Sequence, residues 1–263
     1  MMKLSDAKVV ITGATGGIGQ SVAYLLAERG ARLLLVGRNS DKLISLVQHL
    51  GSEHSWLSAD ISSAQGRADV MLQAKRFEAN MLVNNAGISE FNEFVQLSDA
   101  RLAQAMNINL LAPMSLTRSF LHELGDSPKV VLNVGSALGS IGYPYYASYC
   151  ATKFGLRGFT EALQRELTGS RHQVLYFAPR ATDTSINSDA VKQMNRALGS
   201  KTDTPVEVAQ ALVKQLEQGK KRLAVGWPEK LFARLNGFWP EVVDNALAKK
   251  FTKIQKFVKM VNS

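Results

Sequence analysis

Short aliphatic and β-branched runs alternate with longer amphipathic segments along the first 225 residues. Each run is four to six residues long and ends near a glycine, asparagine, aspartate or proline, which is typical of a buried strand. We predict strands at residues 8–12, 32–36, 54–59, 80–83, 129–134, 172–177 and 221–225. Strands of this length, separated by helices of ten or more residues, indicate βαβ units. The pattern therefore predicts a single α/β domain with a doubly wound parallel sheet of about seven strands, flanked by helices.

A helix is predicted from Ser148 to Leu167, where apolar residues keep helical spacing and no proline interrupts them. Tyr149 and Lys153 lie four residues apart in it, so both side chains project from one face. A free phenol titrates near pH ~10, and a cation beside it favours the phenolate, so this spacing suits general acid–base chemistry. Any surface helix can carry the same pair by chance, so the pair needs support from other motifs.

A glycine-rich turn joins the first strand to an amphipathic helix that ends near Gly30. The turn reads Gly13-Ala14-Thr15-Gly16-Gly17-Ile18-Gly19. In that setting the N–H groups at the helix start can bind a pyrophosphate, and glycine lets the chain turn tightly. The spacing is Gly-x-x-x-Gly-x-Gly, and such turns also join strands to helices without any ligand.

The residue that follows the second strand indicates which dinucleotide is bound. A cofactor with a free ribose 2′-hydroxyl usually meets an acidic residue here, but this chain has Gly37-Arg38-Asn39. A guanidinium pairs with a 2′-phosphate and stacks on adenine, so Arg38 favours NADP(H), with NAD(H) as the alternative. The other interpretation of Arg38 is an exposed loop side chain.

Four motifs, in their order along the chain, resemble those of the short-chain dehydrogenase/reductase family, classical type. They are Thr12-Gly13-x-x-x-Gly17-x-Gly19, Asn84-Asn85-Ala86-Gly87, Asn109, and Ser136 thirteen residues before Tyr149-x-x-x-Lys153. The resemblance extends from about Lys8 to Val225. It implies a Rossmann-like fold and an oxidoreductase that acts on CH–OH or C=O groups with NAD(P)(H).

The resemblance implies a role for each of four catalytic residues. Tyr149 would be the general acid or, in the reverse direction, the base, and Lys153 would lower its pKa and bind the nicotinamide ribose. Ser136 would fix the substrate oxygen, beside Gly135, which would leave room for a reacting group. Asn109 would hold a water that returns the proton through Lys153. The simpler interpretations are a capping serine and an asparagine that kinks a helix.

The resemblance also implies a cofactor site at the glycine turn and at the ends of later strands. Asp60 and Ile61 would lie against the adenine, and Thr184 would meet the nicotinamide end. The predicted cofactor-binding residues are Gly13, Thr15, Gly17, Ile18, Gly19, Arg38, Asp60, Ile61, Asn85, Ala86, Gly87, Tyr149, Lys153, Pro179, Thr182 and Thr184. The four histidines are scattered singly along the chain, so no metal site is predicted.

The chain departs from the family pattern in two places. Members that prefer NADP(H) often carry a basic residue just before the second glycine of the turn, and Gly16 stands there, so Arg38 carries the NADP(H) prediction. After the sixth strand the family usually has Pro-Gly, whereas this chain has Pro179-Arg180. We expect Arg180 to contact a polar substrate group or to tie down a lid, and a plain loop adjustment is the alternative. Residues 185–204 are predicted to form that mobile helical lid.

Residues 226–263 are predicted to be a basic amphipathic helical extension of the domain formed by residues 1–225. Apolar residues at helical spacing form one stripe, and lysines crowd the other side. The stripe comprises Val243, Leu247, Phe251, Ile254, Val258 and Val261. Two interpretations are equally weighted: peripheral contact with an anionic membrane surface, and docking on the chain itself or on a partner subunit.

Composition narrows the functional class further. The chain has 263 residues, 46% of them hydrophobic, a single cysteine and a net charge of +9. One cysteine excludes an internal disulfide and suits a reducing compartment, and neither a signal peptide nor a membrane span is apparent, so a cytoplasmic location is predicted. The basic charge is compatible with nucleic acid, membrane or a phosphorylated ligand, but no nucleic-acid-binding motif accompanies it.

These observations together predict an NADPH-dependent reductase of a ketone or aldehyde, with 3-oxoacyl or other lipid-like compounds as candidate substrates. Two alternatives remain. One is an NAD(P)+-dependent alcohol dehydrogenase, and the other is a non-catalytic, dinucleotide-binding scaffold at a membrane. The family resemblance also implies a homodimer or homotetramer.

Overall fold

The computed structural model describes residues 3–125, 127–227 and 229–260. Its strands form one sheet in the order β3-β2-β1-β4-β5-β6-β7, in which every neighbouring pair is parallel. They are β1 (Lys8–Thr12), β2 (Arg32–Gly37), β3 (Ser55–Ser58), β4 (Met81–Asn84), β5 (Val130–Val134), β6 (Gln173–Ala178) and β7 (Arg222–Ala224). No strand end differs from the predicted one by more than one residue. The predicted fold class is therefore confirmed.

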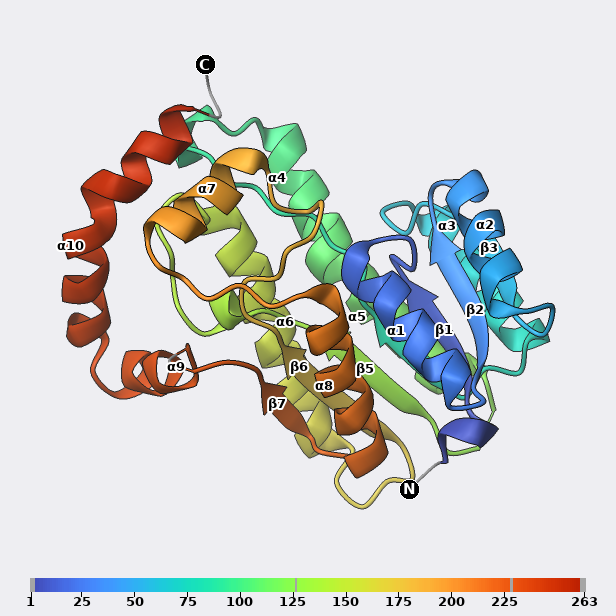
Figure 1. Ribbon diagram of the computed structural model, residues 1–263. Helices are drawn as coiled ribbons and strands as arrows, with labels where there is room; N and C mark the ends of the chain where they lie inside the picture. Colours follow the sequence, from blue (N-terminus) through green and yellow to red (C-terminus); the bar gives the residue numbers. More distant parts are fainter. Residues whose placement is uncertain (1–2, 126, 228, 261–263) are drawn as a thin grey trace.

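Helices cover both faces of this sheet (Figure 1). The α-helices of the described residues are α1 (Gly17–Glu28), α2 (Ser40–Leu50), α3 (Ala64–Arg76), α4 (Asp99–Met106), α5 (Ala112–Glu123), α6 (Ala147–Glu166), α7 (Asp189–Ala197), α8 (Pro205–Gln218), α9 (Glu229–Phe238) and α10 (Pro240–Lys259). Of these, α7, α9 and α10 stand away from the sheet. Because side chains alternate along a strand, Val9 and Ile11 of β1 pack with α1, α2 and α8, while Val10 packs with α3 and α5. The sheet is thus buried on both sides, as its continuous aliphatic strands require.

The strand order reverses between β1 and β4, and the chain forms a crevice at the carboxyl ends of these strands. Gly13 lies there with φ +65°, and a Cβ on it would come within 2.8 Å of Ala86 Cα. A Cβ on Gly19 would come within 2.2 Å of the Gly13 carbonyl oxygen. The glycines therefore let the turn after β1 pack tightly on itself and on the loop after β4.

A chain of buried, hydrogen-bonded polar side chains begins at Asn84, the last residue of β4, and supports the loop that follows it. Asn84 Nδ2 donates to Asn133 Oδ1 of β5 at 2.8 Å, and Asn133 Nδ2 donates to Thr160 Oγ1 of α6 at 2.9 Å. Hydrogen bonding compensates the cost of burying these amides, and it also ties two strands to the helix that carries Tyr149.

The segment after β6 contains a shorter helix than predicted. Residues 185–204 were expected to be helical, but α7 covers only Asp189–Ala197. Its buried Val191 and Met194 pack in one apolar cluster with Tyr146 and with Ile254 of α10. This segment lies next to the N-terminal end of α6 (Figure 1).

The predicted C-terminal helix is in fact two helices, α9 and α10, which meet at an angle (Figure 1). Pro240 cannot continue a helix and instead occupies the first turn of α10. Val243, Ile254 and Val258 of the predicted stripe are buried, and the last two pack against the α7 cluster. The structure thus shows docking on the chain itself for this stripe, whose Val261 lies outside the described residues.

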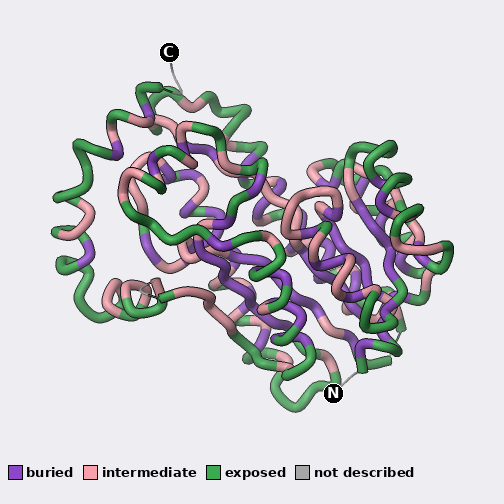
Figure 2. The backbone as a smooth tube through the Cα atoms, in the orientation of Figure 1, coloured by how far each residue is buried: buried purple, intermediate pink, exposed green. Residues whose placement is uncertain are grey.

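Much of the C-terminal arm remains exposed: Figure 2 shows most of α10 as exposed and α9 as a mixture of exposed and half-buried residues. Phe238, Trp239 and Trp227 are exposed at 90%, 67% and 67%. Within the described residues, no helix combines the length and the apolar character needed to cross a bilayer. The membrane interpretation stays a prediction, and it now concerns these aromatic side chains rather than the stripe.

Candidate active site

The crevice at the strand ends is a cleft of about 620 Å³, and it brings together most of the predicted cofactor residues. Those that line it are Gly13, Thr15, Gly17, Ile18, Gly19, Arg38, Asp60, Ile61, Asn85, Ala86, Gly87 and Thr184. The other four, Tyr149, Lys153, Pro179 and Thr182, line an adjoining cavity that shares Ile18, Asn85, Gly87 and Thr184 with the cleft. Residues from distant parts of the sequence therefore meet in one continuous site.

The turn between β1 and α1 is rigidly held, which sequence reasoning did not foresee. Thr12 Oγ1 accepts hydrogen bonds from the N–H groups of Asn85 and Ala86, both at 3.1 Å. Asn85 Nδ2 donates in return to the carbonyl oxygens of Thr12 and Gly13 at 3.1 Å. The turn thus presents the N-terminus of α1 to the cleft, and this donor set fits the pyrophosphate of a dinucleotide. Thr12 directly precedes the first glycine of the motif, and this place in the motif is the sequence feature from which its role could have been predicted.

The far end of the cleft carries two cations, Arg38 and Lys42. Asn39 Oδ1 accepts the Lys42 N–H at 2.8 Å and so caps α2, which fixes Lys42 in the first turn next to Arg38. Asp60 lies at the same end, and hydrogen bonds from Ser62 keep the pKa of its carboxyl below the usual value, with a smaller contribution from Arg38. Lys42 was not among the predicted cofactor residues. The signal that could have found it is Asn39, a typical N-cap residue three positions earlier, which places Lys42 in the first turn of α2.

Ser136, Tyr149 and Lys153 line the adjoining cavity, which has a volume of about 230 Å³. The Lys153 Nζ donates to the carbonyl oxygen of Val134, the last residue of β5, at 2.9 Å. It lies 5.7 Å from the ring centroid of Tyr149. The hydroxyl of Ser136 is hydrogen-bonded to Tyr149, and its Oγ also accepts the Leu138 N–H at 3.1 Å. Ser136 is therefore both a cap and a neighbour of the phenol.

Burial governs the protonation of this pair. It raises the pKa of Tyr149 to about 12, and the hydrogen bond with Ser136 offsets only part of the effect. Burial also lowers the pKa of Lys153 to about 8. Burial outweighs the other influences on the pKa of Tyr149, and the expectation that Lys153 lowers this pKa stays a prediction. The ammonium is directed at the Val134 carbonyl oxygen, and removal of water from the phenol dominates.

Asn109 lies in a π-helical segment, Asn107–Leu111, that joins α4 to α5. Its Oδ1 accepts the Ile88 N–H and its Nδ2 donates to the Ile88 carbonyl oxygen, both at 2.8 Å. The second Nδ2 hydrogen reaches Thr152 Oγ1 at 3.2 Å. Asn109 therefore fastens the loop after β4 to α6, which agrees with the helix-distorting interpretation. The predicted water would have to use the one remaining lone pair of Oδ1.

The space beside Gly135 is filled by the Tyr176 ring. The expectation that Gly135 leaves room for a reacting group is therefore wrong. A Cβ on Gly135 would lie 2.1 Å from the hydroxyl oxygen of Tyr176, and one on Gly139 would lie 2.6 Å from it. Tyr176 is 4% exposed, and burial raises the pKa of its phenol to about 12. The ring supports the loop that carries Ser136 from behind.

Arg180, the residue in the usual glycine position, closes the base of the segment that contains α7. Its Nε donates to Asp203 Oδ2 at 2.8 Å, and a second guanidinium nitrogen donates to the other carboxylate oxygen. The third nitrogen reaches the Trp227 carbonyl oxygen at 3.3 Å and lies 3.8 Å from Glu229. Of the expected roles, the structure shows the one that ties down the lid.

Comparison with known proteins agrees with this geometry. Residues 7–195 match the family described as short chain dehydrogenase. The chain belongs to the short-chain dehydrogenase family. It is therefore an oxidoreductase of the kind that acts on carbonyl or alcohol groups with NAD(P).

Relatives place the chain within this family, and a solved structure shares its fold. It is 33% identical to a bovine 3-oxoacyl-[acyl-carrier-protein] reductase over 81% of this chain and 92% of that protein. It is 31% identical to a bovine 3-ketodihydrosphingosine reductase, with coverages of 86% and 73%. A short-chain dehydrogenase from Sphingobium yanoikuyae, solved in complex with NADPH, superposes with a TM-score of 0.77 at 24% identity, over 90% of this chain and 95% of that one. That last likeness shows the shared fold.

The contact between Gly135 and Tyr176 predicts a conditional destabilisation in this short-chain dehydrogenase. Gly135→Ala should lower the free energy of unfolding by about 1–3 kcal/mol, because the new methyl group overlaps the Tyr176 hydroxyl. In a Tyr176→Ala background, which removes the ring, the same change should cost almost nothing. Urea unfolding measures the free energy of unfolding with and without Gly135→Ala, in the wild type and in Tyr176→Ala. An equal loss of stability in the two backgrounds would contradict the contact.

The buried pair Arg180–Asp203 predicts a larger effect. Asp203→Ala should lower the free energy of unfolding by about 3–5 kcal/mol, because it leaves a buried guanidinium without its carboxylate. The double variant Arg180→Met/Asp203→Leu should lose less, because neither charge remains. Chemical denaturation measures both variants. A single variant as stable as the double one would show that the pair does not hold the lid base.

Proposed function

We propose that this protein reduces the carbonyl group of a ketone or aldehyde to an alcohol with NADPH. The observation that carries the proposal is the meeting of Ser136, Tyr149 and Lys153 in a cavity that opens into a glycine-lined cleft of dinucleotide size. Residues that could bind the cofactor, orient a carbonyl group and transfer a proton therefore lie around one cavity. Oxidation of an alcohol with NAD(P)+ is the alternative direction of the same chemistry.

NADPH would supply the hydride, and this chain's residues would bind the substrate and move the proton. A carbonyl that gains hydride becomes an alkoxide, which needs a proton. Tyr149, with its pKa raised to about 12, is protonated at neutral pH and can give that proton. Ser136 would orient the carbonyl oxygen beside the phenol, and Val134 holds Lys153 in register through its carbonyl oxygen.

Preference for NADPH is supported by the charges at the far end of the cleft. Arg38 and Lys42 both line it, and a 2′-phosphate there would meet a guanidinium and an ammonium. NAD(H) lacks the phosphate and is the weaker candidate.

A 3-oxoacyl or other lipid-like ketone is the substrate class that we favour. Leu138, Val191 and Met194 give part of the wall of the cavity around Tyr149 an apolar character. Two relatives are named for reduction of a 3-oxoacyl and of a 3-keto sphingoid compound. Both observations support a carbonyl close to a hydrocarbon chain.

We further propose that the protein is a homo-oligomer, a dimer or a tetramer. Met106, Leu111 and Phe154 lie on adjacent elements and are 43%, 46% and 41% exposed. Apolar side chains grouped on one face are typical of a subunit contact.

The exposed Trp227, Phe238 and Trp239 support peripheral contact of the C-terminal arm with a membrane surface, in an enzyme that we propose to be cytoplasmic.

The direction and the role of Tyr149 are tested by steady-state turnover of a ketone panel with NADPH. Tyr149→Phe should lower kcat by about 10²-fold or more while NADPH still binds.

The rate of reduction by the wild type should be steady through neutral pH and fall above about pH 8, where Lys153 loses its proton. NADPH binding without turnover of any ketone would instead favour the non-catalytic scaffold.

The cofactor assignment is tested at the far end of the cleft. Arg38→Ala should weaken NADPH binding by about 10- to 100-fold, because a charge-assisted pair with the phosphate is lost. NADH binding should change little, because NADH carries no 2′-phosphate. Fluorescence titration with both cofactors measures the two affinities. An equal loss for NADH and NADPH would show that Arg38 does not read the phosphate.

A further inference from the structure

The catalytic cavity is too small to hold a long substrate. Its volume is about 230 Å³, whereas pockets that enclose drug-sized ligands measure roughly 300–1,000 Å³. Part of its wall, including Asn85, Gly87 and Thr184, is shared with the cofactor cleft, which leaves less space for substrate. A carbonyl compound with a long chain must therefore extend beyond this cavity.

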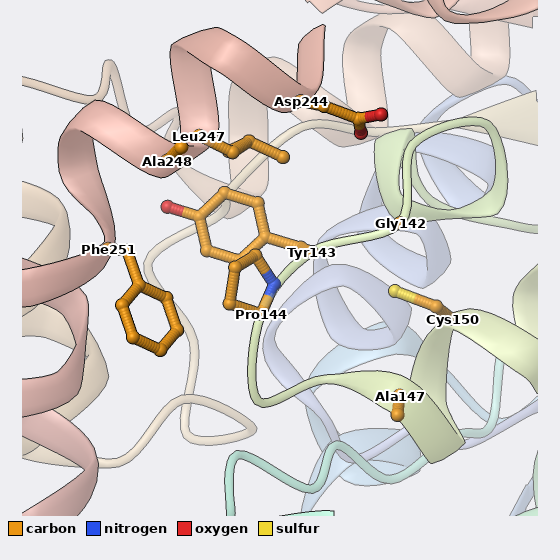
Figure 3. A pocket seen from close by; sticks show the side chains of 9 residues that line it. All are labelled: Gly142, Tyr143, Pro144, Ala147, Cys150, Asp244, Leu247, Ala248 and Phe251. Carbon is orange, nitrogen blue, oxygen red and sulfur yellow. The ribbon is translucent and has the colours of Figure 1, made fainter. Parts of the chain in front are cut away.

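A second hollow begins beside the catalytic cavity. It is an open groove of about 570 Å³ between the first half of α10 and the segment that leads into α6 (Figure 3). Its apolar walls come from Tyr143, Pro144, Ala147, Leu247, Ala248 and Phe251. Among the described residues that line the groove, Asp244 is the one with a charged side chain. Such a surface suits a hydrocarbon chain and disfavours an ionic group.

Aromatic rings connect the groove to the reacting centre. Tyr143 lines both the groove and the catalytic cavity. Its ring packs against Tyr146 with centroids 6.0 Å apart, and Tyr146 packs in the same way against Tyr149, also at 6.0 Å. Figure 3 shows the Tyr143 ring directed toward Leu247 and Ala248 of α10. The groove and the catalytic cavity thus share the Tyr143 ring as a wall, and a chain attached to a carbonyl at Tyr149 would reach the groove past this ring.

One wall of the groove comes from the C-terminal part of the chain. The match to the family ends at residue 195, and one wall of the groove is formed by residues 244–251. This wall is fixed in place, because Ile254 and Val258, further along α10, are buried against the α7 cluster. Phe251 itself stacks on Tyr145 with centroids 5.8 Å apart.

We propose that this groove is the subsite for the hydrocarbon tail of the substrate, so that α10 selects long-chain carbonyl compounds. The proposal rests on the proposed reductase function and adds the substrate's length to it. Each methylene that enters the groove should raise kcat/KM by about three- to fourfold, until the groove is full.

The test compares chain-length dependence in three proteins. Ala248→Trp fills the groove, and Asn245→Trp places the same bulk on the same helix at an exposed position that does not line the groove. Ketones of about four to about fourteen carbons, longer than the cavity alone can enclose, are assayed with NADPH. We expect kcat/KM to rise with length in the wild type and in Asn245→Trp, and to level off in Ala248→Trp with the shortest ketone unaffected. A parallel rise in all three proteins would overturn the subsite.

A binding measurement separates this proposal from the function on which it rests. Dodecanol should raise the melting temperature of the wild type and of Asn245→Trp, but not that of Ala248→Trp. That result would support the groove even if no ketone were reduced, in which case the proposed function alone would fail. Equal stabilisation of all three proteins would overturn the groove assignment. A smaller oligomer in Ala248→Trp by light scattering, with unchanged chain-length dependence, would assign the groove to a second copy of the chain.

Discussion

A buried ammonium is stable only when an acceptor replaces the water that it has lost, and the carbonyl oxygen of Val134 is that acceptor for Lys153. Val134 ends β5, and Ser136 follows two residues later. One contact between a strand end and α6 therefore sets the position of Lys153, of Tyr149 one turn earlier on the same helix, and of Ser136 opposite them. The geometry of the candidate catalytic residues depends on this contact more than on any motif taken alone.

The backbone segments that border the reacting centre each have their own restraint. Asn109 binds both main-chain groups of Ile88 and reaches Thr152 on α6. Tyr176 backs the loop that carries Ser136, and Arg180 fixes the base of the lid through Asp203. These residues act on the position of other groups, so their loss should disturb geometry before chemistry.

Local chemistry explains which features could be predicted from the sequence. Strands were readable because β-branched runs end at residues that break them, and the Tyr149–Lys153 pair was readable because helical spacing is fixed. The place of Tyr176 against Gly135 was not, because it depends on the pairing of β5 with β6, where Asn133 lies opposite Tyr176. The division of the C-terminal arm was readable at Pro240, a residue that starts helices but cannot continue them.

Burial shifts the two titrating groups of the site in opposite directions, and both shifts favour neutral forms. The pKa of Tyr149 rises to about 12 and that of Lys153 falls to about 8. A neutral phenol is a proton donor, and donation is what a carbonyl needs as it becomes an alcohol. The same removal of water from this part of the cavity thus keeps the phenol of Tyr149 in its protonated form.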